Sequence, residues 1–470
     1  MAKSKKSIMG RGMKGVFHAP WERAFDKILT PFEEFIHRQT TSSLLLMGTA
    51  VVALILANGP WAADYVHIMH VPVNLSIGSW SLNMSLHHWI NDGLMAMFFF
   101  VVGLELKREV LVGELADLRN AALPIGAAIG GMVVPALVYF LINPEGEAAM
   151  GWGIPMATDI AFAIGALALL ASRVPKALIT FLVALAIVDD LGAVLVIAVF
   201  YTDTIALGPL AVAVGLFILM LGFNLIGIRK PLPYFIVSLV FWYVVLLSGV
   251  HATLAGVFGA LCVPTRPKYQ PERFSMLVKG LMKRFDSTYQ SGDSILINDE
   301  LRAVVQSLEN GVHSVQAPLQ RLEHAWHMPV AYIVIPIFAL ANAGIPLELA
   351  SMSDTLNHRV FIGVSLGLIL GKFIGITGVS WLMLKLGLAV LPKDTRFIQI
   401  AGVSLLAGIG FTMSIFVAQL GFNERDDLLL VAKTAILLAS FVAGVAGVTW
   451  LYLVSKPVSV DGETDENNGD

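Results

Sequence analysis

The stretch ALITFLVALAIVDDLGAVLVIAVF runs from Ala177 to Phe200 and is apolar almost throughout, except for Asp189 and Asp190 at its centre. A run of this length crosses a bilayer as a helix. On membrane-insertion scales each acidic residue at a helix centre costs roughly 2.5–3.5 kcal/mol. Ordinary packing does not recover that cost for two aspartates, so the pair indicates a function inside the membrane.

The composition of the whole chain also indicates a membrane protein. Of its 470 residues, 56% are hydrophobic and only 14% are charged, whereas soluble domains carry about 25% charged residues. The single cysteine, Cys262, excludes a disulfide within the chain and a thiolate metal cluster. We therefore predict an all-α polytopic membrane protein, and we expect neither a cofactor nor a nucleic-acid partner.

Apolar runs of helical length form two series of six. They cover 42–58, 89–106, 121–142, 151–171, 177–200 and 205–226, then 234–247, 251–263, 329–343, 360–384, 398–420 and 428–453. The open question is whether 234–263 holds one span or two. Lys and Arg gather in every second loop, and a single span there would place the basic loop 264–328 outside, against the positive-inside rule. The consistent prediction is twelve transmembrane helices with both termini in the cytoplasm.

The predicted membrane domain, 42–455, is flanked by a basic cytoplasmic arm at 1–41 and an acidic cytoplasmic tail at 456–470. Within it, the outer loop 59–88 alternates apolar and polar residues on each side of Gly78-Ser79. This alternation predicts a β-hairpin, whose exposed edge can pair with a second copy. The long cytoplasmic loop 264–328 is mixed in charge, and we expect an amphipathic helix near Glu300 to Leu308.

Two spans contain helix-breaking residues. Gly153 and Pro155 precede Thr158 and Asp159 in the fourth span, and Gly408-Ile409-Gly410 interrupts the eleventh. A broken helix leaves free amides and carbonyls inside the membrane. Breaks at matching places in two halves are typical of secondary transporters built from inverted repeats around a midplane site. Spans three to five would match spans ten to twelve.

Three acids and one base share the predicted hydrocarbon depth: Asp159, Asp189, Asp190 and Lys372. Adjacent helical residues point about 100° apart, so Asp189 and Asp190 cannot both face one partner. We expect one to meet Lys372 and the other to face a cavity beside Thr158 and Asp159. Sodium prefers oxygen ligands, which Asp190, Thr158 and free carbonyls would supply. Since neighbouring carboxylates repel when both are ionised, one should hold a proton that an entering cation expels.

Two other classes of function share parts of this pattern. A sodium-coupled symporter of an organic anion also uses broken helices, but an anionic substrate calls for positive or neutral groups and this site is net acidic. An intramembrane aspartyl protease uses two carboxylates, yet it needs them on different helices facing one bond. We therefore predict a cation/proton antiporter and not an enzyme.

The chain resembles the NhaA family of sodium/proton antiporters from about Ser42 to Leu453. The most similar segments are ATDIAFA (157–163), ALAIVDDLGA (184–193), GVHATLAG (249–256) and GIGFTMSI (408–415). The resemblance implies the inverted-repeat NhaA fold, in which the discontinuous spans four and eleven cross. It further implies electrogenic, pH-regulated exchange of sodium or lithium for protons by alternating access, in the bacterial inner membrane, serving sodium and pH homeostasis and salt tolerance.

By position, the resemblance assigns the cation-binding carboxylate to Asp190, its neighbour to Asp189, and the intramembrane lysine to Lys372. Thr158 and Asp159 correspond to the residues of the crossed helices. The resemblance implies that Asp189 and Lys372 form a salt bridge that breaks on proton exchange, and that Asp159 and Lys372 compensate opposed half-helix dipoles. For Asp159, dipole capping and direct cation contact both stay open.

The resemblance also implies a pH-sensing cluster at a cytoplasmic funnel and a homodimer formed through 59–88. The cluster would consist of Glu105, Glu109, Glu323, His324 and His327, with His251 also linked to the pH response. The alternatives are a solvated face for 323–327 and a satisfied structural role for His251. The loop 264–320 is longer than expected for the family, which puts the pH set-point in question.

Overall fold

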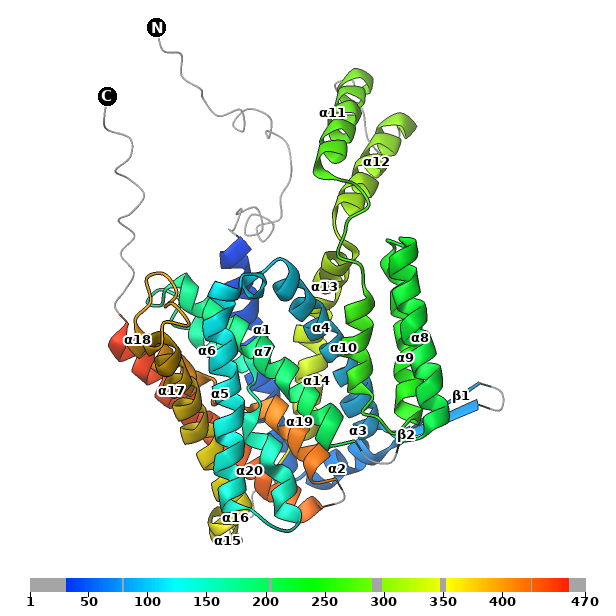
Figure 1. The fold of residues 1–470 in the computed structure, drawn as a ribbon. Coiled ribbons are helices and arrows are strands. Elements are labelled where there is room, and N and C mark those ends of the chain that lie inside the picture. The colour runs from blue at the N-terminus through cyan, green and yellow to red at the C-terminus, as the bar shows by residue number, and fades with distance from the viewer. Residues whose placement is uncertain are drawn as a thin grey trace, which may run out of the picture.

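The computed structural model describes residues 31–77, 80–202, 205–289, 298–346, 352–423 and 425–455, which form a bundle of helices with one small β-hairpin (Figure 1). Among these residues, nine helices are long and apolar enough to cross a membrane, and one bent helix pair makes a tenth. The chain is therefore a multi-pass, all-α membrane protein, as its composition predicts.

The elements of the first half are α1 (Pro31–Asn58), α2 (Ala62–His70), β1 (Pro72–Ile77), β2 (Trp80–Ser85), α3 (Leu86–His88), η3 (Trp89–Leu94), α4 (Met95–Leu111), η4 (Glu114–Ala116), α5 (Leu118–Ile142), η5 (Glu147–Met156), α6 (Ile160–Ala168), α7 (Lys176–Phe200) and α8 (Leu207–Ile226). Those of the second half are α9 (Pro231–Leu247), α10 (Thr253–Cys262), α11 (Pro271–Thr288), α12 (Asp299–Val315), α13 (Pro318–Pro329), η6 (Val330–Val334), α14 (Ile335–Asn342), α15 (Met352–Asn357), α16 (Arg359–Leu366), η7 (Gly367–Gly371), α17 (Lys372–Lys385), α18 (Phe397–Leu406), α19 (Phe411–Gly421) and α20 (Asp426–Val454). The shorter apolar helices α9 and α10 lie where the two short spans are predicted.

The helices pack in two groups (Figure 1). In the site group, 118–200 and 359–454, α5 packs on α7, η5, α16 and α17, while α20 packs on α16, α18 and α19. In the flanking group, 86–111, 207–262 and 318–342, α4 packs on α10 and α13, and α9 packs on α8 and α10. α1 contacts both groups, through α6 and through α14.

Two glycines bring α17 close to α5. A Cβ added to Gly130 would lie 2.3 Å from the carbonyl oxygen of Gly375, and one added to Gly375 would lie 2.2 Å from that of Gly130. Small residues let membrane helices pack backbone to backbone. This contact holds Lys372, one turn before Gly375, fully buried inside the site group.

The predicted β-hairpin is present, with β1 and β2 antiparallel and Val73 opposite Met84. Its turn, Gly78-Ser79, lies outside the described residues. α2, which occupies the first part of the loop, is not predicted from the sequence. This helix is anchored by Tyr65, whose buried side chain donates a hydrogen bond to the Leu340 carbonyl at 2.7 Å.

The long loop contains a helical hairpin, α11 and α12, which projects from the end of the bundle where α1 begins (Figure 1). α12 includes the predicted helix near Glu300 to Leu308. The base of the hairpin is closed because the Ser314 carbonyl accepts hydrogen bonds from the Lys268 and Tyr269 amides, both at 3.0 Å.

Two helices begin earlier in the chain than the sequence predicts. The ninth span was expected to begin at 329, but its helix already begins at Pro318 because α13 continues directly into η6 and α14. α1 begins at Pro31, so it overlaps the predicted basic arm. The rest of that arm and the acidic tail lie outside the described residues.

Candidate functional site

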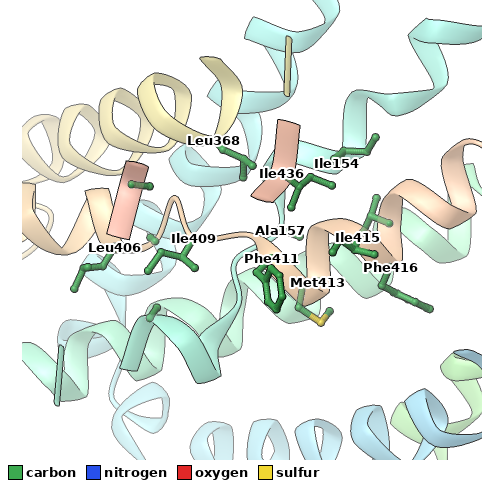
Figure 2. Packing of buried hydrophobic residues seen from close by; sticks show 14 of the residues in the cluster. Ile154, Ala157, Leu368, Leu406, Ile409, Phe411, Met413, Ile415, Phe416 and Ile436 are labelled. Carbon is green, nitrogen blue, oxygen red and sulfur yellow. The ribbon is translucent and has the colours of Figure 1, made fainter. Parts of the chain in front are cut away.

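The two interrupted spans meet at their breaks. Residues 157–159, between η5 and α6, are not helical, and α18 and α19 are bent by 51° about 407–410. The Asp159 amide donates to the Ile409 carbonyl at 2.7 Å, and the Thr158 hydroxyl donates to the Ala407 carbonyl at 2.9 Å. Figure 2 shows Ala157 of one break in the same buried cluster as Ile409 of the other. Backbone groups freed by one break thus find partners at the other.

Asp159 caps two helices. As the N-cap of α6, it accepts a hydrogen bond at Oδ1 from the Phe162 amide at 3.0 Å. Its Oδ2 accepts from the Thr412 amide at 3.1 Å, in the first turn of α19, and also from the Thr412 hydroxyl. Helix N-termini carry partial positive charge that a carboxylate stabilises. Because both oxygens are already engaged, this geometry favours the capping interpretation of Asp159.

Two serines support the broken eleventh span. The Ser440 hydroxyl oxygen accepts from the amides of Gly410 at 3.2 Å and Phe411 at 3.1 Å. The Ser414 hydroxyl donates to the Ile154 carbonyl at 2.9 Å. The sequence analysis assigned neither serine to the site. The only signal in the sequence is a serine within an apolar helix that lies next to a broken one. Serines are common in membrane helices, so this signal does not single out Ser414 or Ser440.

The prediction that one of the paired aspartates meets Lys372 is confirmed. The Lys372 Nζ lies 2.8 Å from Oδ2 of Asp189, and both side chains are buried. The other oxygen of Asp189, Oδ1, is buried and has no hydrogen bond of normal geometry from any residue that the structure describes. The Thr158 amide and hydroxyl lie beside this carboxylate, but the Thr158 hydroxyl proton is donated to Ala407. Asp189 therefore has one oxygen in an ion pair and one oxygen that only Thr158 approaches.

Asp190 faces the other way, into a cavity of about 60 Å³ that Glu105 and His327 also line. One water needs roughly 10–15 Å³ of such volume, so the cavity has room for several waters or a partly hydrated ion. No described residue donates a hydrogen bond to Asp190. The cavity is lined by Ile160 and Ala161 instead of the expected Thr158 and Asp159, because those two side chains are turned toward the breaks.

Most of the predicted pH-sensing residues lie together where α4 meets α13. His327 Nδ1 is 3.3 Å from Glu105 Oε1, and Arg108 bridges Glu323 at 3.0 Å and Glu109 at 2.9 Å. Glu323 also lies near Glu105 and His327. Arg108 joins the acids of two helices, a role that the sequence analysis did not assign to it because a basic residue at the end of a span is expected for topology alone.

Two predicted residues stand apart from this cluster. His324 is exposed on α13. His251 places its ring Nε2 against the Tyr201 carbonyl, at the C-terminal end of α7. Within the described part of the chain, His251 makes no contact with the Glu105 cluster. This contact fits the structural interpretation of His251, and its link to the pH response stays a prediction.

The site combines buried acids, one buried lysine and two helix breaks inside apolar spans. Among the residues that the structure describes, no three His, Cys, Asp or Glu side chains converge as in a resident metal centre. Apolar spans with two touching breaks, a buried ion pair and a carboxylate-lined cavity define a secondary transporter of small cations. The family described as Na+/H+ antiporter 1 matches residues 33–451, and the chain belongs to this family.

Named relatives agree with this membership. The Na(+)/H(+) antiporter NhaA 1 of Saccharophagus degradans is 57% identical over 432 residues, which cover 92% of this chain and 93% of that protein. The Na(+)/H(+) antiporter NhaA of Sulfurimonas denitrificans is 51% identical and covers 93% of this chain and 99% of its own length. That of Syntrophobacter fumaroxidans is 50% identical, with 92% of each chain covered. The resemblance found in the sequence is thereby confirmed as a family relationship.

Proposed function

We propose that this protein is a secondary active Na+/H+ antiporter in which Asp190 exchanges a proton for a sodium ion. The observation that carries the proposal is the setting of Asp190, which is 2% exposed, faces a cavity that Glu105 and His327 also line, and has no hydrogen-bond donor among the described residues. An isolated carboxylate charge at this depth is costly. Asp190 is therefore stable with a bound proton or with a bound cation, and either form excludes the other.

The second oxygen of Asp189 supplies another part of the proposed cation site. Asp189 Oδ1 and Thr158 lie next to each other but outside the cavity of Asp190. They become further oxygen ligands of a sodium at Asp190 only if these side chains turn toward the cavity when the ion binds. Binding there weakens the attraction between Asp189 and Lys372, so that Lys372 can release a proton. Two protons released for one sodium make the exchange electrogenic. Lithium, which prefers the same oxygen ligands, is the second expected cargo.

Regulation by pH is proposed to act at the mouth of the Asp190 cavity. Glu105 and His327 line that cavity and contact each other. Histidine changes its charge in the physiological pH range. A protonated His327 repels an entering cation, and its deprotonation as the pH rises removes that repulsion. This is the direction expected of an exchanger that is activated at alkaline pH.

The proposed topology is twelve spans in the bacterial inner membrane with cytoplasmic termini, α9 and α10 being the two short ones. Inverted repeats would pair α5–α7 with α16–α20, and two features support this pairing. Each set has an interrupted middle span, and the two interruptions contact each other. The hairpin β1–β2 is the proposed contact of a homodimer, since its strands offer unpaired edges.

The test is dequenching of a pH-sensitive dye in inside-out vesicles that hold an acid interior. Sodium and lithium chloride should each dissipate the gradient, and potassium chloride should not. Asp190→Asn should abolish the sodium response, whereas Asp427→Asn, at an exposed position on α20, should retain it. Full activity of Asp190→Asn would overturn the assignment. A response that requires an organic anion together with sodium would favour the symporter instead.

A further inference from the structure

Three amide side chains form a closed ring of hydrogen bonds at the end of the bundle near the β-hairpin. Gln419 donates to the side-chain oxygen of Asn342, Asn342 donates to that of Asn91 at 2.9 Å, and Asn91 donates to that of Gln419 at 3.0 Å. His87 adds a contact to the Asn342 oxygen at 3.0 Å. We call Asn91, Asn342 and Gln419 the amide ring.

The amide ring joins the two groups of helices. Asn91 lies on η3 and Asn342 ends α14, both in the flanking group, whereas Gln419 lies on α19 in the site group. The ring is remote from the Glu105 side of the Asp190 cavity, because Glu105 follows Asn91 by 14 helical residues, or about 20 Å. The ring therefore ties the groups together at the end of the bundle away from Glu105.

An apolar layer lies between the amide ring and the cavity. The three helical stretches that carry the amide ring also contribute Phe99, Phe338 and Phe416. Each of these side chains is at most 1% exposed. Their ring centroids are 5.7 Å apart for Phe99 and Phe416 and 6.3 Å apart for Phe338 and Phe416. Phe416 lies on α19, beyond the break at Ile409 (Figure 2). Gln419 follows it on the same helix. We call these three residues the phenylalanine plug.

We propose that the amide ring is a lock that holds the phenylalanine plug shut, and that it breaks each time the site opens at the β-hairpin end. The inference rests on alternating access in the proposed function, which requires the two groups to part at one end while they close at the other. α19 links the lock to the site, because Thr412 in its first turn donates to Asp159 and Gln419 lies at its far end. A movement of the break at 407–410 would therefore shift α19 and, with it, Gln419 in the amide ring.

The experiment measures access to a reporter cysteine between the two layers. Met95 lies one turn after Asn91 and one turn before Phe99 and is 2% exposed. In a Cys262→Ala, Met95→Cys protein, an impermeant maleimide is added to right-side-out vesicles and the initial labelling rate is measured. Gln419→Met keeps the side-chain length but cannot hydrogen-bond, so it removes both bonds that Gln419 makes in the ring and should raise the labelling rate about thirtyfold. That is the factor expected from two lost hydrogen bonds of about 1 kcal/mol each.

The matched control is Asn58→Ala. Asn58 donates to the Ile345 carbonyl at 2.8 Å, and this hydrogen bond joins α1 to the segment just after α14 and does not cross to the site group. It should leave labelling unchanged. If Gln419→Met lowers the melting temperature but not the protection of the reporter, the ring is only structural and the proposal is overturned. Asn91→Ala repeats the comparison if Gln419→Met does not fold.

The labelling result is independent of the proposed exchange reaction. Absence of sodium-driven dequenching in the parent protein would contradict the proposed function. The labelling rates of the parent and of Gln419→Met would still show whether the amide ring protects the reporter cysteine. Conversely, normal exchange by the parent with equal labelling in Gln419→Met would contradict the lock alone.

Discussion

Lys372 and Asp189 form an ion pair of 2.8 Å at the centre of the bundle, with side-chain exposures of 0% and 1%. The next residue along the helix, Asp190, has no such partner in the part of the chain that the structure describes and lines the cavity instead. Two adjacent and chemically identical side chains are thus given different environments by their 100° divergence around α7. One carboxylate is neutralised by protein, and the other is left for the transported ions.

Removal of Lys372 should destabilise the protein strongly. Lys372→Met leaves Asp189 as an unpaired buried carboxylate, which typically costs about 3–5 kcal/mol. The double variant Asp189→Leu with Lys372→Met removes both charges and should recover most of that loss. Thermal unfolding in detergent measures both effects. A parent-like melting temperature for Lys372→Met would contradict a stabilising pair.

Thr412→Val should weaken the junction of the two breaks. The substitution removes the hydroxyl that donates to Asp159 while keeping the amide donor and the side-chain shape. Loss of one donor to a buried carboxylate costs about 1–3 kcal/mol. We expect a lower melting temperature and a higher sodium KM, whereas Thr412→Ser, which keeps the hydroxyl, should resemble the parent. Equal behaviour of the Val and Ser variants would show that the contact is unimportant.

His327→Gln should shift the pH dependence of exchange toward acid. Glutamine cannot become cationic, so the repulsion of sodium by a protonated imidazole beside Glu105 is lost at low pH. His327→Lys keeps a positive charge at the cavity and should raise the sodium KM at alkaline pH. The measurement is sodium-induced dequenching over a series of pH values. The control is His313→Gln, on the exposed side of α12. An unshifted profile for His327→Gln would remove this residue from the pH response.

The α11–α12 hairpin should be dispensable for exchange itself. Its two helices pack mainly on each other, and the chain enters and leaves it at Tyr269 and Ser314, which are already hydrogen-bonded at 3.0 Å. Replacement of 270–313 by a short Gly-Ser linker should therefore leave the bundle folded. We expect a sodium-saturated rate close to that of the parent, measured in reconstituted vesicles at several pH values. Loss of folded protein would show that the hairpin supports the bundle.

Several parts of the site were predictable because their signals are local in sequence. The apolar run 177–200 with its two aspartates predicts a functional span, and Gly153, Pro155 and 408–410 predict the breaks. The acids and histidine of α4 and α13 came from the family resemblance. The exposed position of His324 could not be predicted, because it depends on which face of α13 packs against α4.

The sequence by itself determined the membrane class, the positions of the breaks and the presence of ionisable groups at depth, because hydrophobicity and helix breaking are properties of short segments. The residues of the span alone left open which aspartate is neutralised; the family resemblance implied Asp189, and the tertiary structure shows the pair. The partner of Asp189, Lys372, lies 183 residues away on another helix. The same holds for Asp159, whose second hydrogen-bond partner, Thr412, is 253 residues away. A buried charge is stabilised by the groups that pack against it. Contacts between helices that are distant in sequence cannot be deduced from the residues of one segment.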